Sequence, residues 1–98
     1  MYLYNVTVIV ENDIREATKT HLHTELRGEQ YRDETFALLE LLDSPHEGAT
    51  YCIQLRCNER ADIAAFQTNE LARIQASLNQ AFPGKVVFFD SIMEYLND

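Results

Sequence analysis

The sequence predicts an α+β domain whose elements follow one another in the order β-α-β-β-α-β. Stretches with strand character open and close the chain, at residues 2–10 and 85–92, and two helical stretches flank a central pair of strands. All three glycines, at positions 28, 48 and 84, fall at boundaries between these stretches, where breaker residues are expected. The 98 residues form a single domain with a modest core, covering residues 1–98.

The first strand, Tyr2–Val10, is rich in β-branched and aromatic residues. Because side chains alternate along a strand, its residues fall into two sets. The set with the stronger apolar character, which we expect to face the core, is Tyr2, Tyr4, Val6, Val8 and Val10. The set that mixes polar and apolar side chains is Leu3, Asn5, Thr7 and Ile9.

A helix is predicted to follow from Asp13. Asp13 and Glu16 have the spacing of a capping box, which supports a helix start at this point. Apolar or small side chains then recur at a helical period, at Ile14, Ala17, Thr18, Leu22 and Leu26.

The two central strands are predicted to form a hairpin. Residues 34–42 contain the apolar run FALLELL, whose length suits either a strand or a helix. The turn-forming segment DSPHEGAT at 43–50 decides for a strand, since a clear strand, Thr50–Cys57, follows it. His46 lies in this turn and is expected to be exposed.

The second helix is predicted over residues 59–82, and Pro83 and Gly84 end it. Its buried stripe is expected to consist of Ile63, Phe66, Ile74, Leu78 and Phe82. The order of elements is that of a ferredoxin-like fold: a four-stranded antiparallel sheet, strand order 4-1-3-2, with two helices on one face.

This fold leaves one face of the sheet without a helical cover. If Glu40 and Asp90 point to solvent, the uncovered face gains a large set of apolar side chains from the second and last strands, namely Phe36, Leu38, Leu42, Val86 and Phe88. A contiguous apolar area seldom stays in water on a monomer. We therefore predict a homodimer of the α/β-barrel type, sheet against sheet, with interface or ligand-binding residues Asn5, Thr7, Phe36, Leu38, Gln54, Arg56 and Phe88.

Two other uses of this face stay open. A small-molecule pocket between the sheets is compatible with the dimer, and a regulatory module would bind effectors at subunit edges. Arg56, with Glu40 or Asp90, is expected to bind a carboxylate ligand or to pair with an acidic side chain. Gln54 and Asn5 either orient a polar ligand or satisfy each other across adjacent strands.

The pair of histidines in HLHTELRGEQY, residues 21–31, raises the question of a metal site. On a helix, residues two apart point about 200° apart, so His21 and His23 cannot bind one metal ion together. His21 and Glu25 share a face, but a third ligand is not evident, and we predict a surface hydrogen bond and no metal. His23, near the helix end, is a candidate general acid or base, against the alternative of a solvated side chain.

Charge and composition narrow the function further. With 8 basic and 16 acidic residues the net charge is −8, which disfavours nucleic acids and anionic membranes as partners. Cys52 and Cys57 should point to opposite faces of one strand, so both are expected as thiols. The chain shows neither a signal peptide nor a membrane-spanning run, and a cytoplasmic location is expected. Without a nucleotide-binding glycine motif, no cofactor is predicted.

Several segments resemble a family of short bacterial proteins that is classed as a domain of unknown function. They are YNVTV at 4–8, GATYCIQLRC at 48–57, the pair Phe66-Gln67, and FPGKVVFFDSIMEYL at 82–96. The resemblance implies a ferredoxin-like, dimeric α/β barrel and no established activity. His23 aligns with the histidine of a His-Ile-Pro-type motif in that family, although Thr24 and Glu25 follow it here.

The leading hypothesis is therefore a homodimeric α/β-barrel protein that acts through its sheet face or a small-ligand pocket. The alternative is a cofactor-independent enzyme of the monooxygenase or isomerase type. In that enzyme His23 would be the acid or base, and Asn5, Gln54 and Arg56 would position the substrate.

Overall fold

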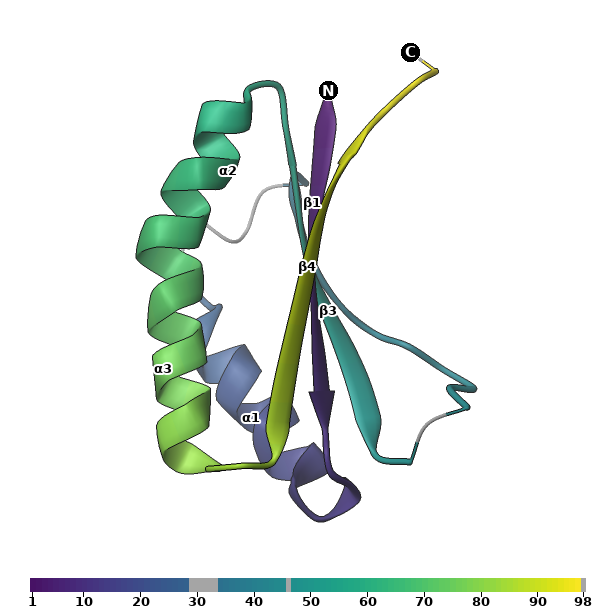
Figure 1. The fold of residues 1–98 in the computed structure, drawn as a ribbon, viewed down its shortest axis with the longest axis vertical. Coiled ribbons are helices and arrows are strands. Elements are labelled where there is room, and N and C mark those ends of the chain that lie inside the picture. The colour runs from purple at the N-terminus through teal and green to yellow at the C-terminus, as the bar shows by residue number, and fades with distance from the viewer. Residues whose placement is uncertain (29–33, 46, 98) are drawn as a thin grey trace.

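The computed structural model describes residues 1–28, 34–45 and 47–97. The elements along the chain are β1 (Tyr2–Val10), a short 3₁₀ turn η1 (Asn12–Ile14), α1 (Arg15–Glu25), β2 (Phe36–Glu40), β3 (Ala49–Cys57), α2 (Arg60–Phe66), a π-helical turn η3 (Gln67–Leu71), α3 (Ala72–Ala81) and β4 (Val86–Glu94). The predicted order βαββαβ is confirmed, because α2, η3 and α3 form one continuous helical rod (Figure 1).

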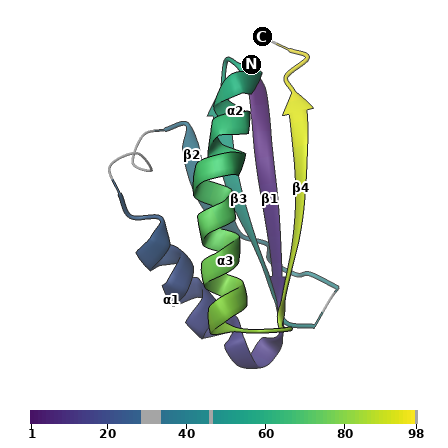
Figure 2. The same cartoon turned by 60° about the vertical axis from the view of Figure 1, so that its left-hand side comes forward.

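The four strands form a single antiparallel sheet in the order β2-β3-β1-β4. This is the predicted order 4-1-3-2 counted from the opposite edge. Both helical segments cover the same face of the sheet, and the other face carries no helix (Figures 1 and 2). The ferredoxin-like fold predicted from the sequence is therefore confirmed.

The core lies between the sheet and the helices. In β1 the predicted inward set is correct, since Tyr4, Val6, Val8 and Val10 are each at most 2% exposed. They pack with side chains from both helical segments, which form one cluster with the sheet: Leu22, Ile63, Phe66, Leu71, Ile74 and Leu78. Alternation along a strand and helical periodicity thus identify the same core from two directions.

The π turn η3 explains one feature of this core. In a regular α-helix Glu70, four residues after Phe66, would continue the buried stripe. The extra residue of a π turn shifts the register, so Leu71 is buried instead, at 5% exposure. The same turn lets Gln67 reach the sheet, where its Nε2 lies 3.4 Å from the hydroxyl of Tyr4.

Two predicted boundaries are wrong. The first helix does not start in a capping box: α1 begins at Arg15, and the Asp13 carboxylate forms an ion pair with Lys85. The Lys85 ammonium lowers the pKa of Asp13. The second strand is shorter than residues 34–42: β2 ends at Glu40, and beyond it the Leu41 amide donates to the Thr50 carbonyl at 2.9 Å.

Candidate functional site

We define the open sheet face as the side chains that point away from the helices. Residues directly opposite each other in an antiparallel pair point to the same side, so the register fixes this set. It comprises Leu3, Asn5, Thr7 and Ile9 of β1; Thr50, Cys52, Gln54 and Arg56 of β3; Ala37 and Leu39 of β2; and Val87, Phe89, Ser91 and Met93 of β4. The predicted contributions of β1 and β3 are therefore correct.

The predicted contributions of β2 and β4 are wrong. Phe36, Leu38, Val86 and Phe88 pack against the core on the helix side. The prediction assumed that the acidic residues of these strands lie on the open face, but each finds a partner on the helix side of the sheet. Glu40 lies 3.3 Å from Arg15 Nη2 and 3.8 Å from Lys19 Nζ.

Asp90 is the acidic residue on the helix side of β4, where it is exposed. Its carboxylate accepts a hydrogen bond from the buried hydroxyl of Tyr4, and Gln67 Nε2 lies 3.4 Å from the same oxygen. Burial and the adjacent Asp90 raise the pKa of Tyr4 to about 12. Sequence reasoning missed this cluster, although an inward-facing tyrosine needs a polar partner for its hydroxyl and so gave a signal.

One end of the open sheet face is apolar and well exposed. Val87 pairs with Ile9, and Phe89 pairs with Thr7 in the next row, which continues to Cys52 and Leu39. Phe89 is 59% exposed and Val87 51%. Large apolar side chains at this exposure, side by side on a flat sheet, form a surface suited to a partner.

Polar side chains cross the middle of the face as a short ladder. Gln54 Nε2 donates to Asn5 Oδ1 at 3.1 Å, and Asn5 Nδ2 donates to Thr7 Oγ1 at 3.0 Å. The sequence left two alternatives for Asn5 and Gln54, binding a polar ligand or bonding to each other. The structure shows the hydrogen bond between them. Their hydrogen bonds lower the cost of removing this row from water.

Arg56 lies at the opposite end and is the charged member of the open sheet face. Its Nη2 donates to the backbone carbonyl of Glu34 at 3.4 Å, and its predicted partners, Glu40 and Asp90, lie on the helix side. Cavities of about 150 Å³ and 360 Å³ adjoin here, and Thr35, Arg56 and Tyr95 line both of them. Among the residues described, no carboxylate forms an ion pair with Arg56.

Two segments project from the sheet on its open side, at opposite ends (Figure 1). The first is the hairpin arm, residues 41–45 and 47–48, which joins β2 to β3; Leu42 in this arm is 73% exposed. At the base of the arm the Leu41 amide donates a hydrogen bond to the Thr50 carbonyl at 2.9 Å. The second projection, residues 95–97, follows β4 and contains Leu96, which is 89% exposed.

His21 and His23 have different surroundings, as predicted. His23 is exposed on α1 and lines a cavity of about 70 Å³ with Lys19 and Glu40, on the helix side of the sheet. The cavities that Gln54 and Arg56 line contain no residue of this one, so the residues of the predicted enzyme site are not brought together. His46 lies outside the described residues.

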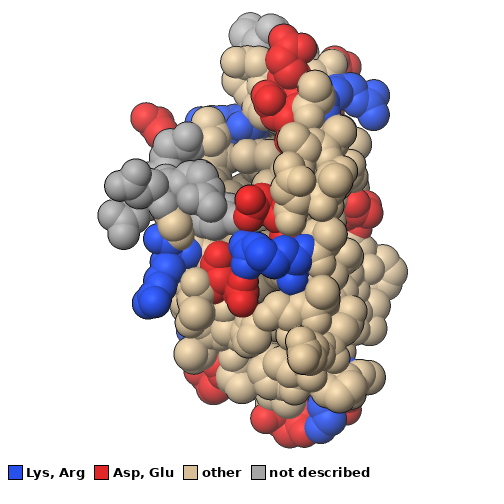
Figure 3. Space-filling view, turned by 90° about the vertical axis from the view of Figure 1, so that its left-hand side faces the viewer, with Lys and Arg blue, Asp and Glu red and all other residues tan. Residues whose placement is uncertain are grey.

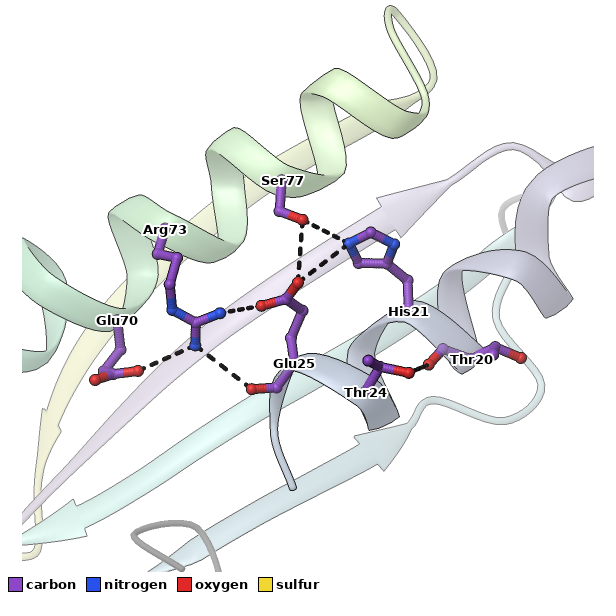
Figure 4. A network of polar contacts seen from close by, with 7 residues as sticks. All are labelled: Thr20, His21, Thr24, Glu25, Glu70, Arg73 and Ser77. Carbon is purple, nitrogen blue, oxygen red and sulfur yellow. Dashed lines mark hydrogen bonds and ion pairs between the residues drawn. The ribbon is translucent and has the colours of Figure 1, made fainter. Parts of the chain in front are cut away.

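His21 takes part in a polar network that joins α1 to α3 (Figure 4). Its Nε2 lies 2.7 Å from Ser77 Oγ and 3.6 Å from Glu25 Oε1, in line with the predicted surface contact to Glu25. Glu25 also pairs with Arg73, which reaches Glu70 at 3.1 Å. Acidic and basic side chains touch one another on the face of the molecule that carries the helices (Figure 3).

The trio of Ser77, His21 and Glu25 does not have the geometry of a catalytic triad. In a triad the acid and the nucleophile contact different ring nitrogens. Here both oxygens approach Nε2, and Ser77 Oγ donates to Glu25 Oε1 at 3.2 Å, so the serine proton is directed to the carboxylate. Within the described part of the chain, no three His, Cys, Asp or Glu side chains group as a metal site would require. The network is a structural link between helices.

The fold and the bare sheet face define a ferredoxin-like protein with an uncovered, largely uncharged sheet surface. The chain belongs to the family called Domain of unknown function (DUF4286), whose model matches residues 1–96. This confirms the resemblance found in the sequence. A search among curated proteins finds no match.

Solved structures with the same fold include proteins described as oxygenases. A candidate antibiotic biosynthesis monooxygenase from Nitrosomonas europaea superposes with a TM-score of 0.71 at 18% identity, over 99% of this chain and 100% of that one. Rv0793 from Mycobacterium tuberculosis gives 0.65 at 14% identity, over 100% and 98%. A variant of SnoaB, a cofactor-independent oxygenase from Streptomyces nogalater, gives 0.64 at 8% identity, over 99% and 95%. At these identities the likeness establishes the fold alone.

Membrane insertion through a helix has no candidate segment in the described ranges. None of the helices there combines the length and the apolar composition that a bilayer crossing requires.

Proposed function

We propose that the protein is a cytoplasmic homodimer whose two open sheet faces pack against each other, and that it acts through this interface and a small-ligand space at its Arg56 end. One observation carries the proposal. The chain has 24% charged residues and a net charge of −8, yet Arg56 is the charged side chain on the open sheet face, and no Asp or Glu belongs to it.

The absence of acidic side chains from this face favours a second copy as the partner. In a two-fold dimer the same surface meets itself, so an acidic patch would oppose an identical acidic patch. A chain with a net charge of −8 would therefore repel its copy through most of its surface. The open sheet face is where two such chains can meet without that repulsion.

The size of the surface also suits a dimer. Nine-residue strands such as β1 span about 30 Å, and four strands at about 4.8 Å spacing give a sheet face of roughly 500 Å². A stable interface buries about 800 Å² on each partner. The hairpin arm and the segment after β4, both on the open side, supply further contact area (Figure 1).

The small-ligand space follows from the chemistry at the Arg56 end. Among the described residues the Arg56 guanidinium has one side-chain hydrogen bond, to the Glu34 carbonyl, which leaves donors for a carboxylate or phosphate. The adjoining cavity of about 360 Å³ reaches the size range of small-molecule sites, which begins at about 300 Å³.

The proposal is tested by comparing two substitutions on the same strand. Phe89→Glu places a charge on the open sheet face, and Ile92→Glu places it on the other face of β4, where Ile92 is 39% exposed. Light scattering on a sizing column should give a dimer for the wild type and for Ile92→Glu, and a monomer for Phe89→Glu. A Phe89→Glu variant that stays as dimeric as its control would contradict the proposal.

The second candidate is a cofactor-independent enzyme with His23 as acid or base. It is favoured by the fold likeness to the proteins described as oxygenases. Within one chain, however, the cavity beside His23 holds about 70 Å³, well below the size of a small-molecule site. A small-molecule turnover assay in which His23→Ala abolishes activity would support this candidate.

A further inference from the structure

We propose that the two open sheet faces meet end to end, so that the hairpin arm of each copy covers the Arg56 end of the other and an acidic side chain of the arm pairs with Arg56. This inference rests on the proposed homodimer and adds its geometry. It also states which partner residues complete the site around Arg56.

Two arrangements are open to a face-to-face dimer with two-fold symmetry. If the two-fold axis runs along the strands, equal ends of the two faces meet, and the two hairpin arms meet each other. If the axis runs across the strands, unequal ends meet, and each arm lies over the partner's Arg56 end. The shape and the charge of the two ends decide between these arrangements.

The shape disfavours the meeting of equal ends. The hairpin arm and the segment after β4 project toward the same side from opposite ends of the sheet (Figure 1). The base of the arm lies beside its own end of the face, since Glu47 lines a cavity with Ile9 and Val87. Two arms at the same end would hold the sheets apart at that end.

The charges favour the meeting of unequal ends. The described residues of the arm carry two carboxylates, Asp43 and Glu47, both on exposed residues. Like charges directly opposed across an interface are destabilising. At the other end, Arg56 contacts the backbone carbonyl of Glu34, and within the described residues no carboxylate pairs with it, which suits a carboxylate of the partner.

The exposed leucines support the same arrangement. Leu42 in the arm is 73% exposed, and Leu96 beyond β4 is 89% exposed. When unequal ends meet, each arm leucine lies near the partner's C-terminal segment, and both are removed from water. The same two contacts then form twice in the dimer. The acidic arm of one copy meets Arg56 of the other, and Leu42 of one copy meets the region of Leu96 of the other.

Charge reversal tests the pairing. Arg56→Glu should raise the dissociation constant of the dimer by at least about tenfold, since two ion pairs become two repulsions. Glu47→Lys should raise it as well. The double variant Arg56→Glu with Glu47→Lys should recover to within about threefold of the wild type. Arg60→Glu, which makes the same change in net charge on α2, is the control and should shift the constant by less than about twofold.

Cross-linking tests the orientation independently. In a background with Cys52→Ser and Cys57→Ser, chains with Pro45→Cys in the arm are mixed with chains carrying Asn58→Cys beside Arg56. Oxidation should form a disulfide between a Pro45→Cys chain and an Asn58→Cys chain. It should not form one between two chains that carry the same substitution. Self-linking of the Pro45→Cys chains, or a dimer that does not link in the mixture, would overturn the arrangement.

The outcomes separate this inference from the homodimer itself. A dimer that Phe89→Glu breaks but Arg56→Glu leaves as tight as the Arg60→Glu control overturns the pairing and keeps the sheet-face dimer. A double variant weaker than either single variant also overturns the pairing. A monomeric wild type overturns both.

Discussion

The hydroxyl of Tyr4 on β1 donates a hydrogen bond to the carboxylate of Asp90 on the neighbouring strand β4. Asp90 is thereby turned toward the helices, and the side chains that alternate with it turn the other way. Val87, Phe89 and Met93 therefore lie on the open sheet face. The contact acts together with Val86 and Phe88, which pack against the core from the same side of β4.

Tyr4→Phe should change how stability depends on pH. The pKa of Tyr4 is raised from 10.0 to about 12, so above pH 10 the unfolded chain loses this proton while the folded chain keeps it. The free energy of unfolding of the wild type should therefore fall as the pH rises from 10 toward 12. Urea unfolding across this range should show a shallower fall for Tyr4→Phe.

Two features shape that experiment. Part of the slope should remain in the variant, because burial also raises the pKa of Tyr51. Tyr95→Phe, which changes an exposed tyrosine, is the control and should follow the wild type. If the free energy of unfolding falls equally with pH in the wild type and in Tyr4→Phe, the Tyr4–Asp90 contact does not contribute to the pH dependence.

Gly48→Ala and Gly84→Ala should differ sharply in cost. Both glycines have positive φ angles, of 89° and 76°, which disfavour alanine by about 1 kcal/mol. At Gly48 a methyl group would also overlap the backbone carbonyl oxygen of Val10, whereas at Gly84 it meets no atom within 4 Å. Thermal unfolding should show a loss of several kcal/mol only for Gly48→Ala; equal losses would mean that the arm is not held against β1.

Glu25→Ala should weaken the link between α1 and α3. Glu25 contacts His21, Ser77 and Arg73, so its removal should lower the free energy of unfolding by about 1–2 kcal/mol. Glu16→Ala, at an exposed acid of the same helix, should cost less than about 0.5 kcal/mol. A double-mutant cycle with Arg73→Ala measures the coupling, and strictly additive effects would contradict a connected network.

The sequence was sufficient for the fold because its local signals agree. The alternation along Tyr2–Val10 and the apolar stripe of the second helix each describe one side of the same core, and both are confirmed. The resemblance to a domain of unknown function is confirmed as well.

The faces of β2 and β4 were not predictable in the same way. Each strand holds apolar residues in both alternating sets, so one acidic residue, Glu40 or Asp90, decided the prediction. Both carboxylates contact residues distant in sequence on the helix side of the sheet, Arg15 for Glu40 and Tyr4 for Asp90. Since side chains alternate, one wrong assignment turns the whole strand over.

The candidate site changed accordingly. Asn5, Thr7, Gln54 and Arg56 stay on the open sheet face, and Phe89, Ala37 and Leu39 take the places expected for Phe88, Phe36 and Leu38. His23 lies on the helix side, where a helix residue must be when both helices cover one face (Figure 2).

The central claim is that this uncovered sheet face joins two copies of the chain. Sedimentation equilibrium of the wild-type protein at micromolar concentration tests it most directly. The chain has a mass of 11.3 kDa, and the proposal predicts a species of twice that mass. A single species of 11.3 kDa at that concentration would contradict it.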